Sequence, residues 1–155
     1  MKKAIFGLLF LVLSGCIGFP PVPTDADYSQ AVETFPEAKS AVYLVKAFWF
    51  PNTYRHMFAL ALEDPTYGIL ALNEDSMIFA IYINSQGKFL QAFNASYSDI
   101  TWIHIEKRSI GSNYMTIQVN NTVHGFECFF AYKNNGESVD RSEVFDFLLK
   151  KVNKK

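Results

Sequence analysis

The feature that most constrains the fold is a series of short apolar segments, separated by turn-forming residues, that runs from about residue 41 to about residue 132. The segments are five to nine residues long and rich in aromatic and β-branched residues, a composition typical of strands. In one of them, Ile103 and Ile105 alternate with polar or amphipathic side chains, as in a strand with one buried face. The predicted strands are Val42–Phe50, His56–Leu62, Gly68–Leu72, Met77–Ile83, Phe89–Ala95, Ile100–Lys107, Tyr114–Val119 and Gly125–Tyr132.

The connections between these segments are short and have the chemistry of turns. They include Glu63-Asp64-Pro65, Asn84-Ser85-Gln86-Gly87 and Asn120-Asn121-Thr122. Short connections join antiparallel neighbours, because a parallel crossover needs a dozen or more residues. The strands are therefore predicted to form an antiparallel sheet.

Two amphipathic helices are predicted to flank the strands. One lies near residues 28–35, where apolar residues recur at helical spacing, and Pro36 ends it. The other begins at an N-cap, Asp140, with Glu143 at the third helical position, and lysines follow near its C-terminus. Its apolar stripe consists of Val144, Phe145, Leu148, Leu149 and Val152. The predicted fold class is therefore mainly β with a capping C-terminal helix (α+β), plus a short N-terminal helix.

The amino terminus has the pattern of an export signal. Lys2 and Lys3 precede an apolar run from residue 4 to residue 13. A helix of about ten residues spans ~15 Å, about half of the ~30 Å of membrane hydrocarbon, so the run favours a signal peptide over a membrane span. The next residues, Leu13-Ser14-Gly15-Cys16, resemble the lipobox of bacterial lipoproteins. This resemblance implies that residues 1–15 are removed and that the Cys16 thiol receives a diacylglyceryl group. An ordinary signal peptide with a chance cysteine is the alternative.

Residues 16–27 are expected to be a short tether between the lipid and the folded domain. Pro20, Pro21 and Pro23 favour an extended chain of ~3.1 Å per residue, so the domain stays near the membrane. Two or more acyl chains hold a protein stably on a bilayer. The lipobox therefore implies a lipid-anchored protein of the cell envelope. In Gram-negative lipoproteins an Asp after the cysteine commonly signals inner-membrane retention, so Ile17 at this position favours the periplasmic leaflet of the outer membrane if the source is Gram-negative. A Gram-positive source would place the protein on the outer face of the plasma membrane.

Two further patterns resemble a known domain family. The segment Gly68-Ile69-Leu70-Ala71-Leu72-Asn73-Glu74-Asp75-Ser76-Met77-Ile78-Phe79 is similar to a hairpin of GRAM and bacterial PH-like domains, and Tyr97-Ser98-Asp99-Ile100 is similar to the entry to their next strand. The order of strands followed by one helix extends the resemblance over residues 41–153, after a short helical segment at residues 28–40. The resemblance implies a bent antiparallel sheet or barrel whose C-terminal helix buries Phe145 and Leu148 in one open end. Ser76 stands where the family often has a basic residue, so phosphoinositide binding is not expected.

Several classes of function are disfavoured by the composition and the motifs. Without Lys2 and Lys3 the 14 basic side chains fall to 12, against 15 acidic ones, which argues against a nucleic-acid partner. The three histidines, at positions 56, 104 and 124, do not have the spacing of a metal site, and no Gly-x-Ser-x-Gly motif or phosphate-binding loop occurs. We therefore expect no metal, no cofactor and no enzymatic activity. Cys128, flanked by phenylalanines, is expected to be a buried thiol.

The apolar excess of two strands is the feature that a simple core explains least. The segment Tyr43–Phe50 is apolar on both faces except at Lys46, and Met77–Ile83 contains no polar residue. One face of each strand would line the barrel, and the other face needs cover as well. The predicted helix at residues 28–35 could pack across it. The other hypothesis is an exposed docking surface around Trp49 and Phe79 for a protein, a second copy or a lipid chain.

These observations lead to two hypotheses of function. The first is a non-enzymatic, membrane-anchored envelope lipoprotein that serves as a protein-binding or scaffolding module, through the surface around Trp49 and Phe79 or by strand addition at a sheet edge. The alternative is a carrier or sensor of a small apolar or lipid ligand held between the barrel and its helix.

Overall fold

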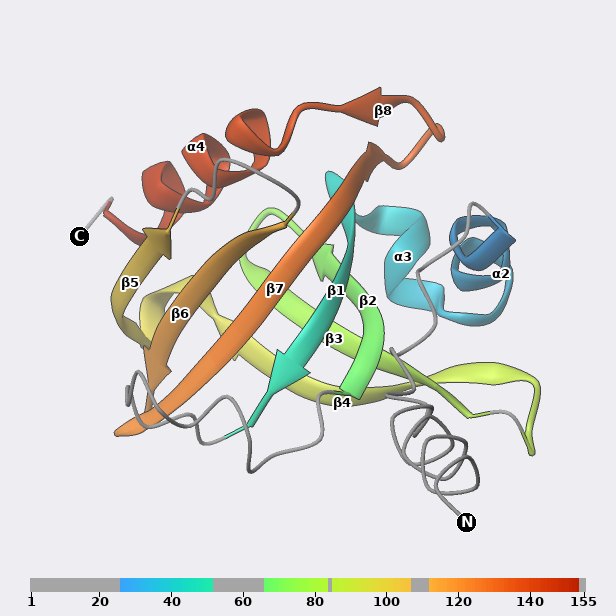
Figure 1. The fold of residues 1–155 in the computed structure, drawn as a ribbon, viewed down its shortest axis with the longest axis horizontal. Helices are drawn as coiled ribbons and strands as arrows, with labels where there is room; N and C mark the ends of the chain where they lie inside the picture. Colours follow the sequence, from blue (N-terminus) through green and yellow to red (C-terminus); the bar gives the residue numbers. More distant parts are fainter. Residues whose placement is uncertain (1–25, 52–65, 84, 107–111, 154–155) are drawn as a thin grey trace, which may run out of the picture.

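The computed structural model describes residues 26–51, 66–83, 85–106 and 112–153 (Figure 1). Two helices, α2 (Ala26–Thr34) and α3 (Pro36–Ser40), come first, and α4 (Arg141–Val152) comes last. A short 3-10 helix, η1 (Tyr97–Asp99), joins the fourth strand to the fifth. The strands are β1 (Tyr43–Phe50), β2 (Thr66–Leu72), β3 (Ser76–Ile83), β4 (Lys88–Ser96), β5 (Ile100–Glu106), β6 (Asn113–Val119), β7 (Thr122–Lys133) and β8 (Ser138–Val139).

The strands form one antiparallel sheet in the order β4-β3-β2-β1-β7-β6-β5, with the short β8 paired to β7. This confirms the predicted fold class: the sheet is open and bent, carries a C-terminal helix, and is consistent with a PH-like α+β fold. Seven of the eight predicted strands occur at or close to their expected positions. The predicted strand His56–Leu62 lies outside the described residues.

Contacts across the interior show how strongly the sheet curls. In the strand order, β3, β2 and β1 separate β4 from β7. The ring of Phe93 in β4 nevertheless lies 4.7 Å from that of His124 and 5.8 Å from that of Phe126, both in β7. The inner faces of the two halves therefore meet in one core, as the curved ribbons of Figure 1 show.

Helix α4 covers one end of this core. The Asp140 side chain accepts a hydrogen bond from the Ser142 backbone N–H at 2.7 Å, which supplies the predicted N-cap. Phe145 and Leu148 are 2% and 1% exposed and belong to the interior cluster, as the resemblance implied. The hydroxyl of Tyr43, at the start of β1, donates to a Glu143 carboxylate oxygen at 2.7 Å and fixes the first turn of the helix to the sheet.

Helices α2 and α3 cover the outer face of the sheet. Pro36 ends the first helix, as predicted, and also stands in the first turn of the second, where its missing N–H costs no hydrogen bond. The two helices and the strands below them form a second buried cluster, distinct from the barrel interior. It contains Ala31, Phe35, Ala38, Ala41, Leu44, Ile69, Ala71, Ile78, Ala80 and Phe89. The hypothesis that a helix covers the second apolar face of these strands is therefore confirmed.

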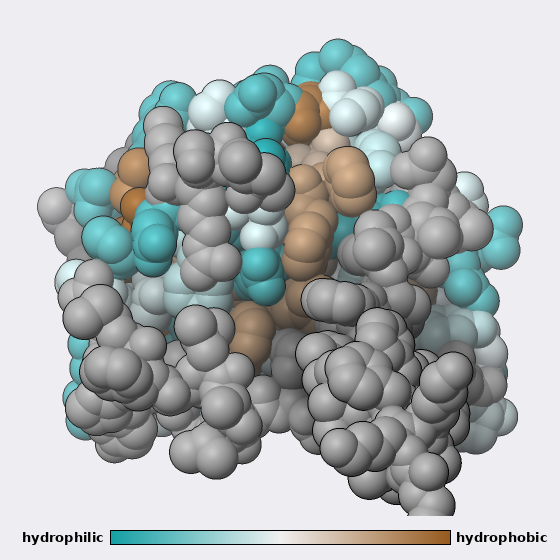
Figure 2. Space-filling model, in the orientation of Figure 1, coloured by the Kyte–Doolittle hydropathy of each residue, from teal (hydrophilic) through white to brown (hydrophobic). Residues whose placement is uncertain are grey.

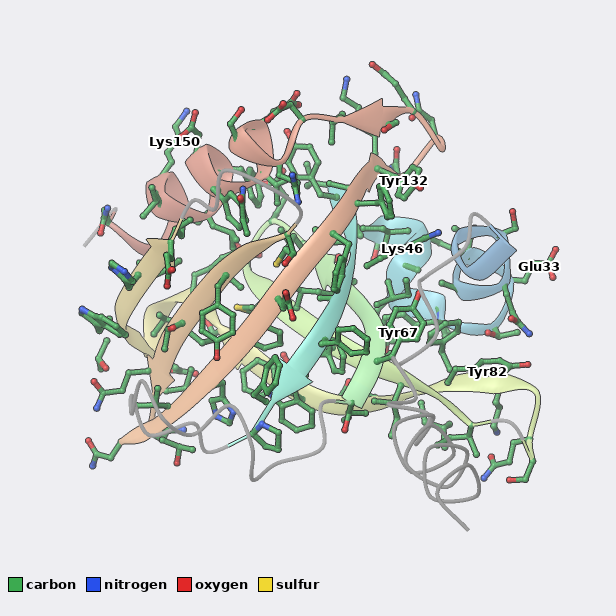
Figure 3. All side chains as sticks on the ribbon, in the orientation of Figure 1. Glu33, Lys46, Tyr67, Tyr82, Tyr132 and Lys150 are labelled. Atoms are coloured by element: carbon green, nitrogen blue, oxygen red, sulfur yellow. The ribbon has the colours of Figure 1, made fainter. Side chains whose placement is uncertain are left out.

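Lys46, the polar residue that interrupts the apolar run of β1, is also buried. Its side chain is 1% exposed, and its ammonium lies 5.4 Å from the ring centroid of Tyr132 on the outer face of β7 (Figure 3). The ring face provides a favourable electrostatic contact for the charge, and the aliphatic stem covers apolar surface. Lys46 is therefore part of the packing of this face.

The turn between β6 and β7 determines which residues of β6 form backbone hydrogen bonds with β7. Asn120 and Asn121 have φ values of +49° and +67°, the left-handed values that a two-residue type I′ turn requires. Val119 and Thr122 flank this turn and lie opposite each other in the register. Residues in this position exchange backbone hydrogen bonds, so the odd-numbered residues of β6 bond to β7.

Candidate functional site

Trp49 and Phe79, the residues predicted to form an outer docking surface, lie on the inner face of the sheet. Phe79 is 0% exposed, and its ring centroid lies 5.6 Å from that of Trp49. Both residues pack in the interior cluster with Phe126. The expected outer position is wrong, because α2 and α3 cover the outer face of the sheet. Side chains alternate between the two faces along a strand, and those of Trp49 and Phe79 point to the inner face.

His124 lies beside the interior cluster, in contact with the rings of Trp49 and Phe93. The His124 ring stacks on that of Trp49, with centroids 6.0 Å apart and an angle of 25° between the planes. The Trp49 Nε1 and His124 Nδ1 atoms are buried and have no hydrogen-bond partner among the described residues. Burial lowers the pKa of His124, because the charged imidazolium is poorly solvated there. The neutral form is therefore favoured in the folded protein.

The His124 imidazole should make the stability depend on pH. An ordinary histidine in an unfolded chain has a pKa of about 6.5, and folding lowers the pKa of His124. The unfolded chain then binds a proton more readily than the folded protein, so the free energy of unfolding should fall as the pH drops below about 6.5. Since one proton is involved, the unfolding equilibrium constant should change at most about tenfold per pH unit. Urea unfolding between pH 8 and pH 5 should show this slope. His124→Gln should flatten it, and the exposed control His104→Gln should leave it in place; an unchanged slope in His124→Gln would contradict the assignment.

The remaining candidates for chemistry have structural roles in the described part of the chain. Cys128 is buried, as expected, and burial raises the pKa of its thiol to about 12, so the reactive thiolate is disfavoured. No group of three or more His, Cys, Asp or Glu side chains that could hold a metal ion occurs among the described residues. Cys16 and the signal-like segment lie outside these residues, and every described helix is too short or too polar to cross a membrane.

The strongest candidate for an interaction site is the end of the sheet formed by β5. Its one neighbour among the described strands is β6, on which Thr116 lies opposite His104. Since the odd-numbered residues of β6 bond to β7, its even-numbered residues bond to β5, and His104 directs its backbone groups toward β6. The alternation then directs the backbone N–H and C=O groups of Ile103 and Ile105 toward the outer edge.

A groove lies beside this edge. It has a volume of about 350 Å³ and runs between the first half of β5 and the C-terminal end of α4. Its lining residues are Ile100, Thr101, Trp102, Ile103, Val152 and Asn153. On the other face of β5, the rings of Trp102 and His104 stack at 5.8 Å with an angle of 6°. The edge therefore presents apolar side-chain contacts as well as backbone groups.

The opposite end of the sheet, β4, has protections that the described residues do not provide at β5. The Phe89 backbone N–H donates to the Thr34 hydroxyl oxygen of α2 at 3.3 Å, so the helix occupies part of this edge. A register shift opposite Phe79 and Ala80 interrupts the middle of β4, and Lys88 stands at its start. Bulges, lysines and covering helices are the usual protections of edge strands. The sequence of β5 has neither lysine nor proline, and its one register shift lies at its start, between Ile100 and Trp102.

Two other surface features are weaker candidates. A second groove, of about 360 Å³, lies near the start of β1, but the charged groups on its rim include Glu74 and Lys133, which form ion pairs with Lys151 and Glu137. Apolar surface also appears over β1 and β7 in Figure 2, and the Phe130 side chain there is 47% exposed. Single exposed apolar side chains are common on soluble domains, so Phe130 alone indicates no partner.

Comparison with known proteins adds no assignment. No family model matches the chain, and no curated protein matches it. The choice of the β5 edge as the candidate interaction site rests on its geometry. One signal of it was present in the sequence, namely the clear alternation of Ile103 and Ile105 in a segment that has no proline.

Proposed function

We propose that this protein is a non-enzymatic, lipid-anchored module of the cell envelope that binds an extended protein segment by strand addition to β5. The observation that carries the proposal is the position of β5 at the end of the strand order, beside the groove at α4. In strand addition, backbone hydrogen bonds supply affinity, and pockets for alternate side chains supply specificity. β5 offers both elements on one rigid sheet.

The side chains next to the edge define what a bound segment would contact. A segment paired with Ile103 and Ile105 would place every second side chain on the inner side of the sheet, next to Val152 in the groove. The intervening side chains would lie along the stacked Trp102 and His104 rings. The favoured segment is therefore extended, with apolar residues at alternate positions.

The predicted anchor determines where such a partner would be found. Cys16 precedes the start of α2 at Ala26 by ten residues, which span ~31 Å when extended at ~3.1 Å per residue. A diacylglyceryl group on Cys16 would therefore hold the domain within one domain diameter of a bilayer. Partners would be envelope proteins or proteins of the same membrane surface.

Ligand carriage is less well supported than protein binding. The carrier hypothesis needs space between the barrel and α4, and large side chains occupy this region in the described structure. Phe79, Phe126 and Leu148 are each at most 1% exposed and pack in one cluster. The groove at β5 lies at the surface end of this cluster, where Ile100, Ile103 and Val152 form part of its lining.

A proline at the outer edge tests the proposal directly. The Ile105 N–H points away from β6, so Ile105→Pro should keep the ladder to β6 and remove a donor that an added strand needs. With a photo-crosslinking residue at exposed position 104 of the full-length protein in cells, we expect a discrete adduct with a protein, and Ile105→Pro should reduce its yield at least tenfold.

Ile105→Ala is the matched control, because it shortens the side chain and keeps the N–H. It should retain most of the adduct, and a crosslinker at Gln91 on β4 should give little. Circular dichroism should show that the proline variant remains folded, whereas His104→Pro, which removes a bond to β6, should not fold. Equal adduct yields from Ile105→Pro and Ile105→Ala, in folded proteins, would refute strand addition.

A further inference from the structure

The sequence of β5 is complementary to itself when two copies are placed antiparallel. With a two-fold axis at His104, Ile103 of each copy lies opposite Ile105 of the other. These are the residues whose backbone groups point to the outer edge, so they form a hydrogen-bonded pair on each side of the axis. Apolar side chains then meet apolar side chains on the inner face.

The outer face is also matched in this register. Trp102 of each copy lies opposite Glu106 of the other, which brings an indole N–H donor near a carboxylate. With the axis one residue earlier, at Ile103, Ile105 would lie opposite the polar Thr101 of the other copy. Cross-strand pairs of this kind determine the register of a sheet, and they favour the axis at His104.

We infer that the partner segment bound at β5 is the β5 strand of a second copy, so that two chains join their sheets edge to edge about a two-fold axis at His104. The inference rests on the proposed strand addition and names its partner. The same strand serves as both donor and acceptor, which is the condition for a closed two-fold dimer. The segment paired in this register, Trp102 to Glu106, is short, and confinement of both copies to one membrane surface would raise their effective concentration.

The geometry gives a specific covalent test. His104 directs its backbone groups toward β6, so the His104 residues of the two copies would form a non-hydrogen-bonded pair with Cα atoms about 4.5 Å apart. This separation lies within the range of about 4.4–6.8 Å that a disulfide spans. The native Cys128 is buried, so it should not compete for an oxidant.

The experiment uses full-length His104→Cys protein in the membranes of expressing cells, oxidised with copper-phenanthroline and analysed on a non-reducing gel. We expect a disulfide-linked homodimer at a yield at least tenfold above that of Gln91→Cys, which places an exposed cysteine on β4. Adding Ile105→Pro should abolish the excess, and adding Ile105→Ala should keep it. Equal yields from positions 104 and 91 would mean random collisions and would overturn the inference.

The outcome also separates this inference from the proposed function. If the photo-crosslinked adduct at position 104 contains a different protein and the His104→Cys disulfide does not form, strand addition stands and the second copy is excluded. If neither product forms in folded protein, both proposals fail. Coexpression of Trp102→Cys and Glu106→Cys chains should give a mixed disulfide in the expected register, and its absence beside a His104→Cys dimer would exclude the axis at His104.

Discussion

Replacement of Gly68 by alanine should destabilise the fold by about 3 kcal/mol or more, because a well-packed core resists even one added carbon. A Cβ atom on Gly68 in β2 would lie 2.1 Å from the Ala80 carbonyl oxygen and 2.6 Å from Cζ of Phe79. The first of these atoms belongs to the backbone of the neighbouring strand, and the second to a fully buried ring. Neither can move away without disturbing β3. Urea unfolding of purified protein should show the loss as a lower transition midpoint.

Gly87 provides the control for this experiment. It has φ +62°, and an added Cβ there would lie 4.0 Å from the Tyr82 hydroxyl oxygen. Gly87→Ala should therefore cost about 1–2 kcal/mol, the price of a left-handed conformation in a residue with a side chain. A Gly68→Ala variant no less stable than Gly87→Ala would show that β2 and β3 are not packed as closely as described.

Replacement of Phe79 by alanine should cost about 3–5 kcal/mol, the usual effect of removing a fully buried aromatic ring. Phe79 is 0% exposed and contacts the rings of both Trp49 and Phe126, at 5.6 Å and 5.8 Å. The Phe79 ring joins β3 to β1 and β7 across the interior, so Phe79→Ala should unfold at a much lower urea concentration than the unchanged protein. Phe130→Ala, which removes an exposed ring, should change stability by less than about 0.5 kcal/mol.

The same pair of variants distinguishes a core role from a docking role. A docking residue would lose partner adducts while the free energy of unfolding stayed unchanged. If Phe79→Ala behaved in that way, its placement in the interior would be incorrect, and the surface predicted around Trp49 and Phe79 would again be the favoured site.

Much of the fold could be predicted because its signals are local. The alternation in β5, the turn at Asn120 and Asn121, and the N-cap at Asp140 each determine a structure within a few residues. Gly68 also has a local reason, since the Ala80 carbonyl and the Phe79 ring of the adjacent strand β3 leave no space for a side chain.

The orientation of the strands could not be predicted in the same way. Tyr43–Phe50 is apolar on both faces, so the pattern does not show which face lines the interior. That choice depends on α2 and α3, which bury Leu44 and Ile78 from outside and leave Trp49 and Phe79 for the inside. The end position of β5 depends on a nonlocal fact as well, because η1 joins β4 to β5 without pairing them.

Because the domain has two separate buried clusters, its response to a pulling force depends on where the force is applied. Tension applied through the N-terminal segment enters at α2, whose contacts with the sheet lie in the outer cluster of Ala31 and Phe35. The interior cluster and α4 do not share those residues, so the helical layer can detach while the bent sheet and α4 remain packed together. A chain pulled from its N-terminal end would thus shed its outer layer first, with the β5 edge on the part that remains folded.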